Sequence, residues 1–442
     1  MISNLPLAMQ AAIQEGYLAK QFEFGLIGNR VFSGICDVQS FPMRVGETIT
    51  RTRVGLRAPN TTPIAPSANT GLDNGITLSQ DRLEQYSMSL NFYGDGDNIN
   101  MVDDGVAIAN TAVVKSKTLG IQAIQSKDRL ARFKLDEMSR SGNTVVKTTL
   151  GAPATTVAVD DITGFEYVLI KGAVQGSGIM VPVSASHPLT VTIADGVYSL
   201  VGVTADVVNV SKRPRGVSGT LTFSANVVVL DGTAGNAVKA AFGSTVIRPS
   251  GKKSAEALVS TDRLTFQMVL DAATELSSNA VPMIDGAYNC YITARHLRQL
   301  FLDPEFQLLY RGAHGAAEIK SGQVTELAGL RFIVTTEADT GYKPGSIFVS
   351  KAYVVGADAL VEGRFAGQSA GTDTMNESII TENDGIIFLV NSGLDRAAET
   401  IRMTWKMRVG FAAPTDQLAD ASVIPTASNA AYKRQVLIET AA

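Results

Sequence analysis

The stretch MVDDGVAIANTAVVKSKTLGIQAIQSKDRLARFKLDEMSR, residues 101–140, decides how this chain is organised, because no proline interrupts it. Asn98 or Asn100 can cap its start, and Asp103 and Asp104 suit the positive end of a helix dipole. Its apolar side chains recur every three or four residues, the spacing of one helix face: Val102, Val106, Ala109, Val113, Ile121, Ile124, Leu130, Phe133 and Met138. We predict one helix about 60 Å long, longer than a small domain is wide.

An arm and a hairpin are predicted before this helix. Residues 1–20 are typical of a helical arm or loop, and the apolar run FEFGLIGNRVF at 22–32 is expected to dock on a neighbouring surface. Residues 48–54 (TITRTRV) and 85–92 (QYSMSLNF) alternate like strands. The segment 58–66 between them holds three prolines, which exclude a central strand there. We therefore predict an extended hairpin that projects from the body of the protein.

A segment of different composition follows the long helix. Residues 151–223 contain short β-type runs that glycine, aspartate and asparagine turns separate. The runs are 157–159, 167–170, 191–193, 198–204 and 220–223. This pattern predicts a small all-β insertion domain, either a barrel or a sandwich.

The rest of the chain is typical of a mixed α/β region. Helices are predicted at Arg263–Ser277, where Ser260-Thr261-Asp262 can cap the start, and at Ala294–Leu302. The predicted strands are Tyr288–Thr293, Leu330–Thr335, Ser346–Ser350, Gly385–Val390 and Thr400–Phe411, the last of which carries the only tryptophan. We expect an α+β protein with an all-β insertion.

The composition favours a globular protein that uses part of its surface for partners. The 442 residues suggest two or three domains, and 45% hydrophobic residues supply ample core while only 18% are charged. A net charge of -4 gives no global signature of nucleic-acid binding. Cys36 and Cys290 form no C-x-x-C pair, which argues against a disulfide framework or a zinc ribbon. We expect no secretory signal and no membrane span.

One motif suggests a hydrolase, but its context does not support it. Residues 367–371 (GQSAG) fit the G-x-S-x-G pattern around a nucleophilic serine, here Ser369. That site needs a helix after the serine and a histidine later in the chain. The segment that follows is polar, and His187, His296 and His314 all precede Ser369. A glycine-rich surface loop is the better interpretation.

Three further motifs are interpreted as turns. Asp339-Thr340-Gly341 resembles the aspartic-protease triplet, but the chain holds no second copy to supply the paired carboxylate. Residues 251–254 (GKKS) resemble the end of a P-loop, but Val246 stands where its first glycine belongs. Residues 94–98 (GDGDN) have calcium-loop composition without the glutamate at the twelfth position, so a turn and helix cap is expected. The sequence thus predicts no catalytic, metal or cofactor site.

Arginines gather around the predicted hairpin. The densest basic cluster is Arg44, Arg51, Arg53 and Arg57. Such a cluster can meet DNA phosphates or acidic residues of a neighbouring subunit. Its position on an extended hairpin favours subunit pairing, and these four residues are our candidate inter-subunit contacts.

The order of arm, hairpin, long helix and mixed core resembles the HK97-fold major capsid proteins of tailed phages. Four strings resemble the N4-type major capsid family in particular: 279–286 (NAVPMIDG), 288–292 (YNCYI), 303–306 (DPEF) and 322–337 (GQVTELAGLRFIVTTE). The resemblance divides the chain into an N-terminal arm at 1–47, an E-loop hairpin at 48–93, a P-domain with the spine helix at 94–147, the all-β insertion domain at 148–224, an A-domain at 225–395, and a return strand with the C-terminal tail at 396–442.

The resemblance implies self-assembly into hexamers and pentamers of an icosahedral shell that encloses double-stranded DNA. Scaffold, portal and cement proteins are implied partners, and the expected location is the virion capsid after assembly in the host cytoplasm. Some relatives join subunits through an isopeptide bond from an E-loop lysine. This chain has no lysine between Lys20 and Lys115, so we expect non-covalent stabilisation and no enzymatic activity.

Two alternatives stay open. The same fold also builds encapsulin-like nanocompartments, which enclose a cargo enzyme, although the all-β insertion favours a virus. A hydrolase that uses Ser369 or Asp339 belongs to a different class, and it would need a histidine beside Ser369 in the folded chain.

Overall fold

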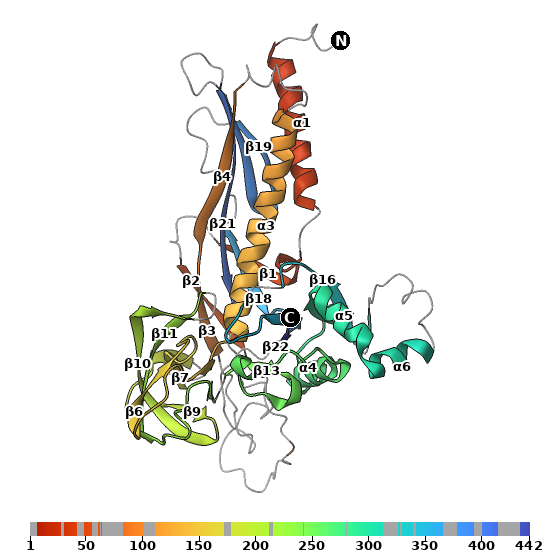
Figure 1. Ribbon diagram of the computed structural model, residues 1–442. Helices are drawn as coiled ribbons and strands as arrows, with labels where there is room; N and C mark the ends of the chain where they lie inside the picture. Colours follow the sequence, from red (N-terminus) through yellow and green to blue (C-terminus); the bar gives the residue numbers. More distant parts are fainter. Residues whose placement is uncertain are drawn as a thin grey trace. The chain divides into compact units, whose positions relative to one another are not determined.

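The computed structural model describes the chain in fifteen separate ranges and two single residues, and gaps lie between them (Figure 1). These are residues 7–27, 31–41, 48–54, 61, 63, 83–100, 111–171, 178–211, 215–241, 243–279, 281–312, 326–327, 329–338, 342–365, 378–392, 400–413 and 434–442. The chain forms two compact units. The first comprises 1–50, 87–134 and 360–412, and the second comprises the remaining residues.

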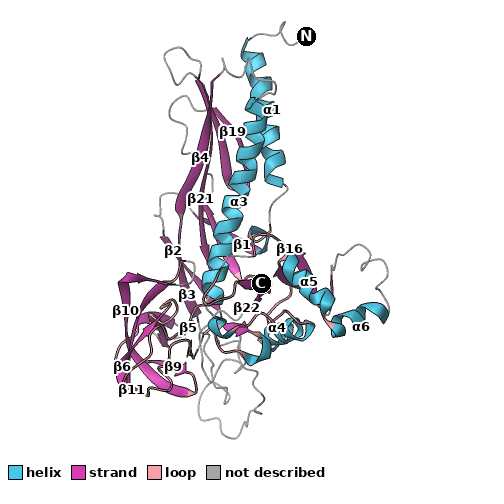
Figure 2. Ribbon diagram, viewed as in Figure 1, coloured by secondary structure: helices cyan, strands magenta, loops and turns pink. Residues whose placement is uncertain are grey.

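The first unit is a helix pair packed on a sheet. Helix α1 (Leu7–Ile27) and the first part of α3 (Thr111–Ser139) lie side by side along the strands (Figures 1 and 2). The sheet has the order β1 (Cys36–Phe41), β18 (Leu360–Phe365), β21 (Thr400–Ala412), β20 (Ile386–Ser392) and β19 (Ser378–Asn383), and β4 (Asn91–Asn100) also pairs with β21. The predicted strands at 385–390 and 400–411 are confirmed as β20 and β21.

Alternation along β21 builds the core of this unit. Met403, Trp405, Met407 and Val409 are buried, while Arg402 and Arg408, which alternate with them along the strand, are exposed. This is the period of two that places successive side chains on opposite faces of a sheet. The buried side chains meet α1 and α3 in one apolar cluster.

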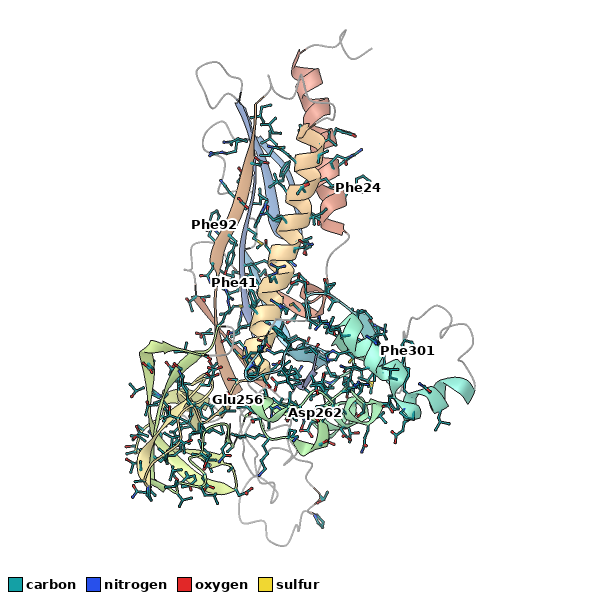
Figure 3. All side chains as sticks on the ribbon, in the orientation of Figure 1. Phe24, Phe41, Phe92, Glu256, Asp262 and Phe301 are labelled. Atoms are coloured by element: carbon teal, nitrogen blue, oxygen red, sulfur yellow. The ribbon has the colours of Figure 1, made fainter. Side chains whose placement is uncertain are left out.

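Phe22, the first residue of the apolar run at 22–32, packs on the sheet of its own unit. The Phe22 ring stacks on Phe388 of β20 with 4.3 Å between ring centroids. Phe24, two positions along the same helix, is 65% exposed and projects away from the strands (Figure 3). One face of α1 therefore packs against the sheet of its own unit.

Two glycines allow the helices α1 and α3 to approach closely. A Cβ atom on Gly120 would lie 2.3 Å from the carbonyl oxygen of Phe22, and one on Gly25 would lie 2.5 Å from that of Lys117. The Ser116 hydroxyl donates to the Leu18 carbonyl at 2.8 Å at the same crossing. Backbone contacts this short exclude any side chain larger than hydrogen.

The segment 94–98 (GDGDN) is a strand, so the expected turn and helix cap there is wrong. It lies within β4, which pairs with β21 without a break from Asn91↔Val409 to Asn100↔Thr400. A Cβ atom on Gly94 would lie 2.8 Å from the Trp405 carbonyl oxygen, and one on Gly96 would lie 2.8 Å from Thr404 Oγ1. Glycine at these two positions therefore allows β4 to pair with β21 over its full length. Long-range pairing thus overrides the local turn preference of glycine and aspartate.

The predicted long helix is confirmed from Thr111 to Ser139, and residues 101–110 lie outside the described chain. Gly142, which follows the helix, adopts a positive φ of 68°. That conformation favours glycine and agrees with the predicted end of the helix.

The second unit contains a mixed sheet with the order β13 (Thr245–Ile247), β22 (Gln435–Ala441), β17 (Val349–Val355), β14 (Tyr288–Ile292), β16 (Leu330–Val334) and β15 (Glu326–Leu327). One face is apolar and carries α4 (Phe266–Ser278), α5 (Ala294–Leu302) and α6 (Pro304–Gly312). The predictions for α5, β14 and β16 are confirmed. The strand predicted at 346–350 instead runs from Val349 to Val355, because these are the residues that pair with β22.

The predicted cap of α4 is wrong. The helix begins after Thr265, and Asp262 uses its Oδ2 atom to accept from the Val259 N–H at 2.8 Å. The Phe266 N–H instead donates to Asp303 Oδ2 at 2.7 Å. A carboxylate distant in sequence thus replaces the local cap at the positive end of the helix.

The all-β segment forms its own sheet with the order β5 (Asn143–Val145), β12 (Ala237–Ala240), β9 (Leu189–Ile193), β10 (Gly196–Val210), β11 (Val217–Val227) and β6 (Ala154–Val159), beside a hairpin of β7 (Tyr167–Lys171) and β8 (Gly178–Pro182). The predicted runs all lie in these strands. β5 and β12 come from outside residues 151–223, so the sheet is larger than predicted. The six domain boundaries themselves stay predictions.

The predicted hairpin forms between β2 (Thr48–Val54) and β3 (Leu83–Ser89). Most of its proline-containing tip lies outside the described residues. No helix in the described ranges is long and apolar enough to cross a membrane.

We predict that Gly120→Ala destabilises the protein by about 1–3 kcal/mol, because the new methyl group overlaps the backbone of α1. Gly16→Ala is the matched control on α1, since nothing lies within 4 Å of a Cβ there. The control should gain about 1 kcal/mol from helix propensity. Urea unfolding of the unassembled protein measures both values, and equal stabilities for the two variants would contradict the close crossing.

Candidate functional site

Two of the four arginines predicted to contact neighbouring subunits lie on strand β2 of the β2–β3 hairpin. Arg51 is half-buried on β2, and Arg53 lies on the same strand. Arg44 and Arg57 lie outside the residues that the structure describes. Two of the four are therefore placed on one strand, and their contact with another subunit stays a prediction.

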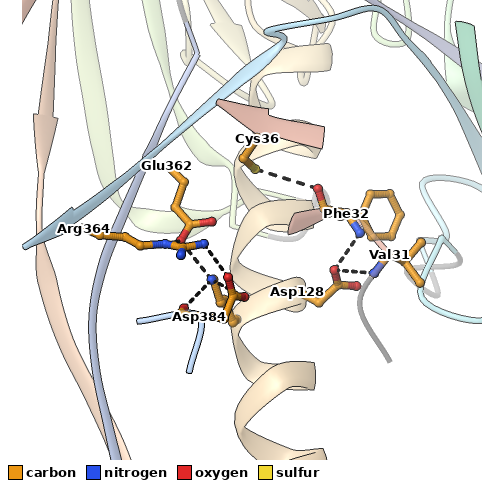
Figure 4. Close-up of polar contacts among 8 residues, drawn as sticks. Val31, Phe32, Cys36, Asp128, Glu362, Arg364 and Asp384 are labelled. Carbon is orange, nitrogen blue, oxygen red and sulfur yellow. Dashed lines mark hydrogen bonds and ion pairs between the residues drawn. The ribbon is translucent and has the colours of Figure 1, made fainter. Parts of the chain in front are cut away.

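The first unit holds a buried ionic cluster, which we call the Asp384 cluster: Lys127, Glu362, Arg364 and Asp384 (Figure 4). The ammonium group of Lys127 lies 2.9 Å from Glu362 Oε1 and 2.7 Å from Asp384 Oδ2. Arg364 donates from Nε to Glu362 Oε1 and from Nη2 to Asp384 Oδ1, the latter at 2.7 Å. The two positive and two negative charges cancel, so the cluster as a whole is neutral, which lowers the cost of burying its charges.

A tight turn positions Asp384. Asn383 pairs with Ile386, so Asp384 and Gly385 alone connect β19 to β20. Both residues have positive φ, 56° and 74°, which is the backbone of a type I′ turn. Lys127 also donates to the Asp384 carbonyl at 2.8 Å. The end of this hairpin is thereby attached to α3 and to β18.

Asp128, the next residue on α3, positions the chain that follows α1. Its Oδ1 atom accepts from the N–H groups of Val31 at 3.0 Å and Phe32 at 2.6 Å (Figure 4). A carboxylate that accepts two backbone hydrogen bonds is well satisfied although it is buried. Adjacent charged residues of α3 thus hold two separate parts of the first unit.

The second unit holds another ionic cluster, the Asp136 cluster, at the end of α3. Asp136 Oδ1 accepts from Lys351 Nζ and from the Tyr353 hydroxyl, each at 2.8 Å, and Oδ2 accepts from Arg140 Nη2 at 2.6 Å. Lys351 and Tyr353 lie on β17, on the sheet face opposite the apolar core. Nearby, Arg248 pairs with Glu439 of β22 at 2.8 Å.

The Asp136 cluster shifts the protonation of its members. Burial by itself would raise the pKa of Asp136, but Arg140 and Lys351 outweigh it and hold this pKa well below its ordinary value. Burial and the neighbouring Arg140 lower the pKa of Lys351 to about 8, against the attraction of Asp136 and Glu439. Asp136 is therefore a permanent anion at neutral pH.

The described histidine and cysteine side chains have structural surroundings. His296 is buried in a capping box with Thr293 at the start of α5, and its Nε2 lies 2.9 Å from Thr440 Oγ1. Burial raises the pKa of the Cys290 thiol to about 12, which disfavours a reactive thiolate. Within the described ranges, no three of His, Cys, Asp and Glu gather to hold a metal ion.

The sequence motifs are placed only in part. Lys253 of the GKKS segment pairs with Asp195 on the surface at 2.7 Å, and Ser250 and Gly251 form a turn with positive φ. This agrees with the predicted basic turn. Ser369, Asp339 and His314 lie outside the described residues, so the hydrolase alternatives are untested.

Sequence reasoning missed both ionic clusters. The available signal was a charged residue in an apolar stripe: Lys127 is in line with buried Ala123, Ala131 and Leu135 on α3. A charge at such a position implies a buried partner. The partner itself could not be named, since Asp384 is 257 residues away.

Comparison with known proteins gives structural relatives alone: no protein-family model matches the sequence, and no curated protein matches it. The chain is similar to the capsid structure of the cyanophage P-SCSP1u, with a TM-score of 0.48 and 10% identity over 93% of this chain and 88% of that one. It is also similar to the capsid of Ralstonia phage GP4, with a TM-score of 0.47 and 10% identity over 92% and 87%.

These similarities concern the fold. The chain resembles phage capsid proteins in structure. A virus-like particle from Pyrococcus furiosus is similar as well, with a TM-score of 0.36 and 8% identity over 95% of this chain and 97% of that one. The finer resemblance to the N4-type family stays a prediction.

We predict that Lys127→Met destabilises the protein by about 3–5 kcal/mol, because it leaves the carboxylate of fully buried Glu362 without its lysine partner. Lys115→Met is the matched control, since the pair of Lys115 with Asp97 is largely exposed. The control should cost less than about 1 kcal/mol. Equal losses in urea unfolding would show that the Asp384 cluster contributes little.

We predict a distinct pH dependence for Asp136→Asn. The folded pKa of Asp136 lies below the ordinary value of 3.8, so its charge stabilises the fold above about pH 4, and this stabilisation declines as the pH falls further. The variant should be less stable than the wild type at pH 7, and the difference should narrow below pH 4. Unfolding free energies measured from pH 7 to pH 2.5 provide the check, and a constant difference would contradict it.

Proposed function

We propose that this protein is the major capsid protein of a tailed double-stranded DNA phage, and that it assembles with copies of itself into an icosahedral shell. The supporting observation is the set of elements in the folded chain. The arm helix α1, the hairpin β2–β3, the long helix α3 and the mixed sheet follow one another along the chain, and the late strand β21 packs in the same apolar cluster as α3, in the order that the resemblance to HK97-fold capsid proteins predicts.

Surface properties support assembly. In the described residues β2 and β3 pair only with each other, and an isolated two-stranded hairpin is marginally stable in water. Large apolar side chains are also exposed, with Leu230 at 81%, Leu308 at 70% and Val197 at 68%. Elements and side chains of this kind gain stability when a partner covers them.

The proposal includes the finer expectations of the resemblance. Hexamers and pentamers of this chain form the shell in the host cytoplasm, scaffold, portal and cement proteins associate with it, and packaged DNA lies against it. The role is structural rather than enzymatic. Arg44, Arg51, Arg53 and Arg57 contact neighbouring subunits in this shell.

We predict that the purified protein forms closed shells, or pentamers and hexamers, in size-exclusion chromatography and negative-stain electron microscopy. Extended hairpins and arms favour obligate contacts that bury more than about 2,000 Å². A monomer that persists across salt and protein concentration would contradict the proposal. Native particles should protect double-stranded DNA from nuclease. Particles that instead hold a cargo enzyme and no DNA would indicate an encapsulin-like nanocompartment.

A further inference from the structure

Three exposed arginines gather at helix α5 in the second unit. Arg295 and Arg298 lie three positions apart on α5 and are both exposed. Exposed Arg263 precedes Leu264, whose N–H donates to Gln299 Oε1 of α5 at 2.8 Å. Arg263 is therefore attached beside the same helix. We call these three residues the arginine face.

The arginine face is unfavourable in a single subunit. Arg295 occupies the second position of α5, where the helix dipole favours acidic residues, and the first turn contains none. Like charges three positions apart on a helix also repel. Across the described ranges, no ion pair involves Arg263, Arg295 or Arg298. These positions therefore weaken the helix, and no ion pair among the described residues compensates for it.

Helix α4 shows the opposite pattern. Asp271 is exposed and Glu275 is half-buried, and the two carboxylates lie four positions apart, where like charges again repel. Glu275 lies in the last turn, where the dipole favours cations, and that turn contains none. Glu275 accepts a hydrogen bond from Thr245 Oγ1 at 3.3 Å, but neither carboxylate has an ion pair within the described chain. We call this pair the acidic face.

The two faces belong to different parts of the same layer. α4 packs against β22 and α5 packs against β14, and β17 lies between these two strands in the sheet. Each face lacks the charge that the other presents. Two different patches on one subunit that fit each other describe a head-to-tail contact, which builds a ring when the rotation between copies closes.

We propose that the arginine face of one copy binds the acidic face of α4 on a neighbouring copy. The inference rests on the proposed shell function and names the surface through which copies join. Charge complementarity favours a second copy over nucleic acid. Phosphates would neutralise Arg295 and Arg298 but would leave Asp271 and Glu275 with their mutual repulsion, whereas a second copy relieves both.

Charge reversal tests the contact. The variant R295E/R298E makes both faces acidic, and D271R/E275R makes both basic. Each should raise the protein concentration for half-maximal assembly at least about tenfold, because like charges then oppose each other in the contact. The variant with all four substitutions restores the complementarity with the signs exchanged, and it should assemble within about threefold of the wild type.

The same variants also show whether a loss of assembly results from a loss of folding. Arg295→Glu and Glu275→Arg each place the charge that the helix dipole favours, while Arg298 and Asp271 lie in the middle of their helices, so the melting temperature of the unassembled protein should change little. K239E/K252E is the matched control for R295E/R298E, since it makes the same change of net charge at residues that belong to neither face. Its assembly should match the wild type.

The outcomes separate this inference from the proposed function. A wild-type chain that never assembles would overturn the shell function. Wild-type shells together with normal assembly of R295E/R298E would overturn the inference alone. Loss of assembly in both reversal variants without recovery in the fourfold variant would also overturn it, since the faces would then meet other partners. Recovery in the fourfold variant supports the contact.

Discussion

Helix α3 carries charges that have no access to water, and both units are arranged around their neutralisation. The ammonium group of Lys127 is fully enclosed and meets Glu362 and Asp384, which come from β18 and from the turn before β20. An unpaired buried charge costs several kcal/mol, so β18 and this turn must return to α3 for the first unit to fold. The buried carboxylate of Asp128 likewise needs the N–H groups of Val31 and Phe32, so the chain after α1 must also lie against α3.

The second unit repeats this principle with the opposite sign. Asp136 is the buried anion, and Arg140, Lys351 and Tyr353 satisfy it. Lys351 and Tyr353 lie on a sheet whose other face is apolar and carries α4, α5 and α6. Side chains alternate between the two faces of β17, so Lys351 and Tyr353 bind Asp136 on one face while Ala352 and Val354 pack in the apolar core on the other. Removal of one member of such a cluster is costly, because it leaves a buried charge without compensation.

Buried and exposed charges differ in a way that fits a protein made for assembly. The charges of the Asp384 and Asp136 clusters meet opposite charges within their own unit, whereas the exposed arginines of α5 and the carboxylates of α4 face like charges. A subunit gains from that surface pattern when a neighbour brings the missing charge, and the low proportion of charged residues, 18%, makes such patches conspicuous.

Local patterns in the sequence determined the elements with strong periodicity. The spacing of apolar residues predicted α3, and the alternation of Met403, Trp405 and Met407 predicted β21. These features depend on residues within one or two turns of each other. Tertiary structure alone decided that residues 94–98 extend as a strand, that Asp303 caps α4, and that Lys127 meets Asp384. Each depends on a partner far along the chain, and local propensity holds no information about which distant residues will meet.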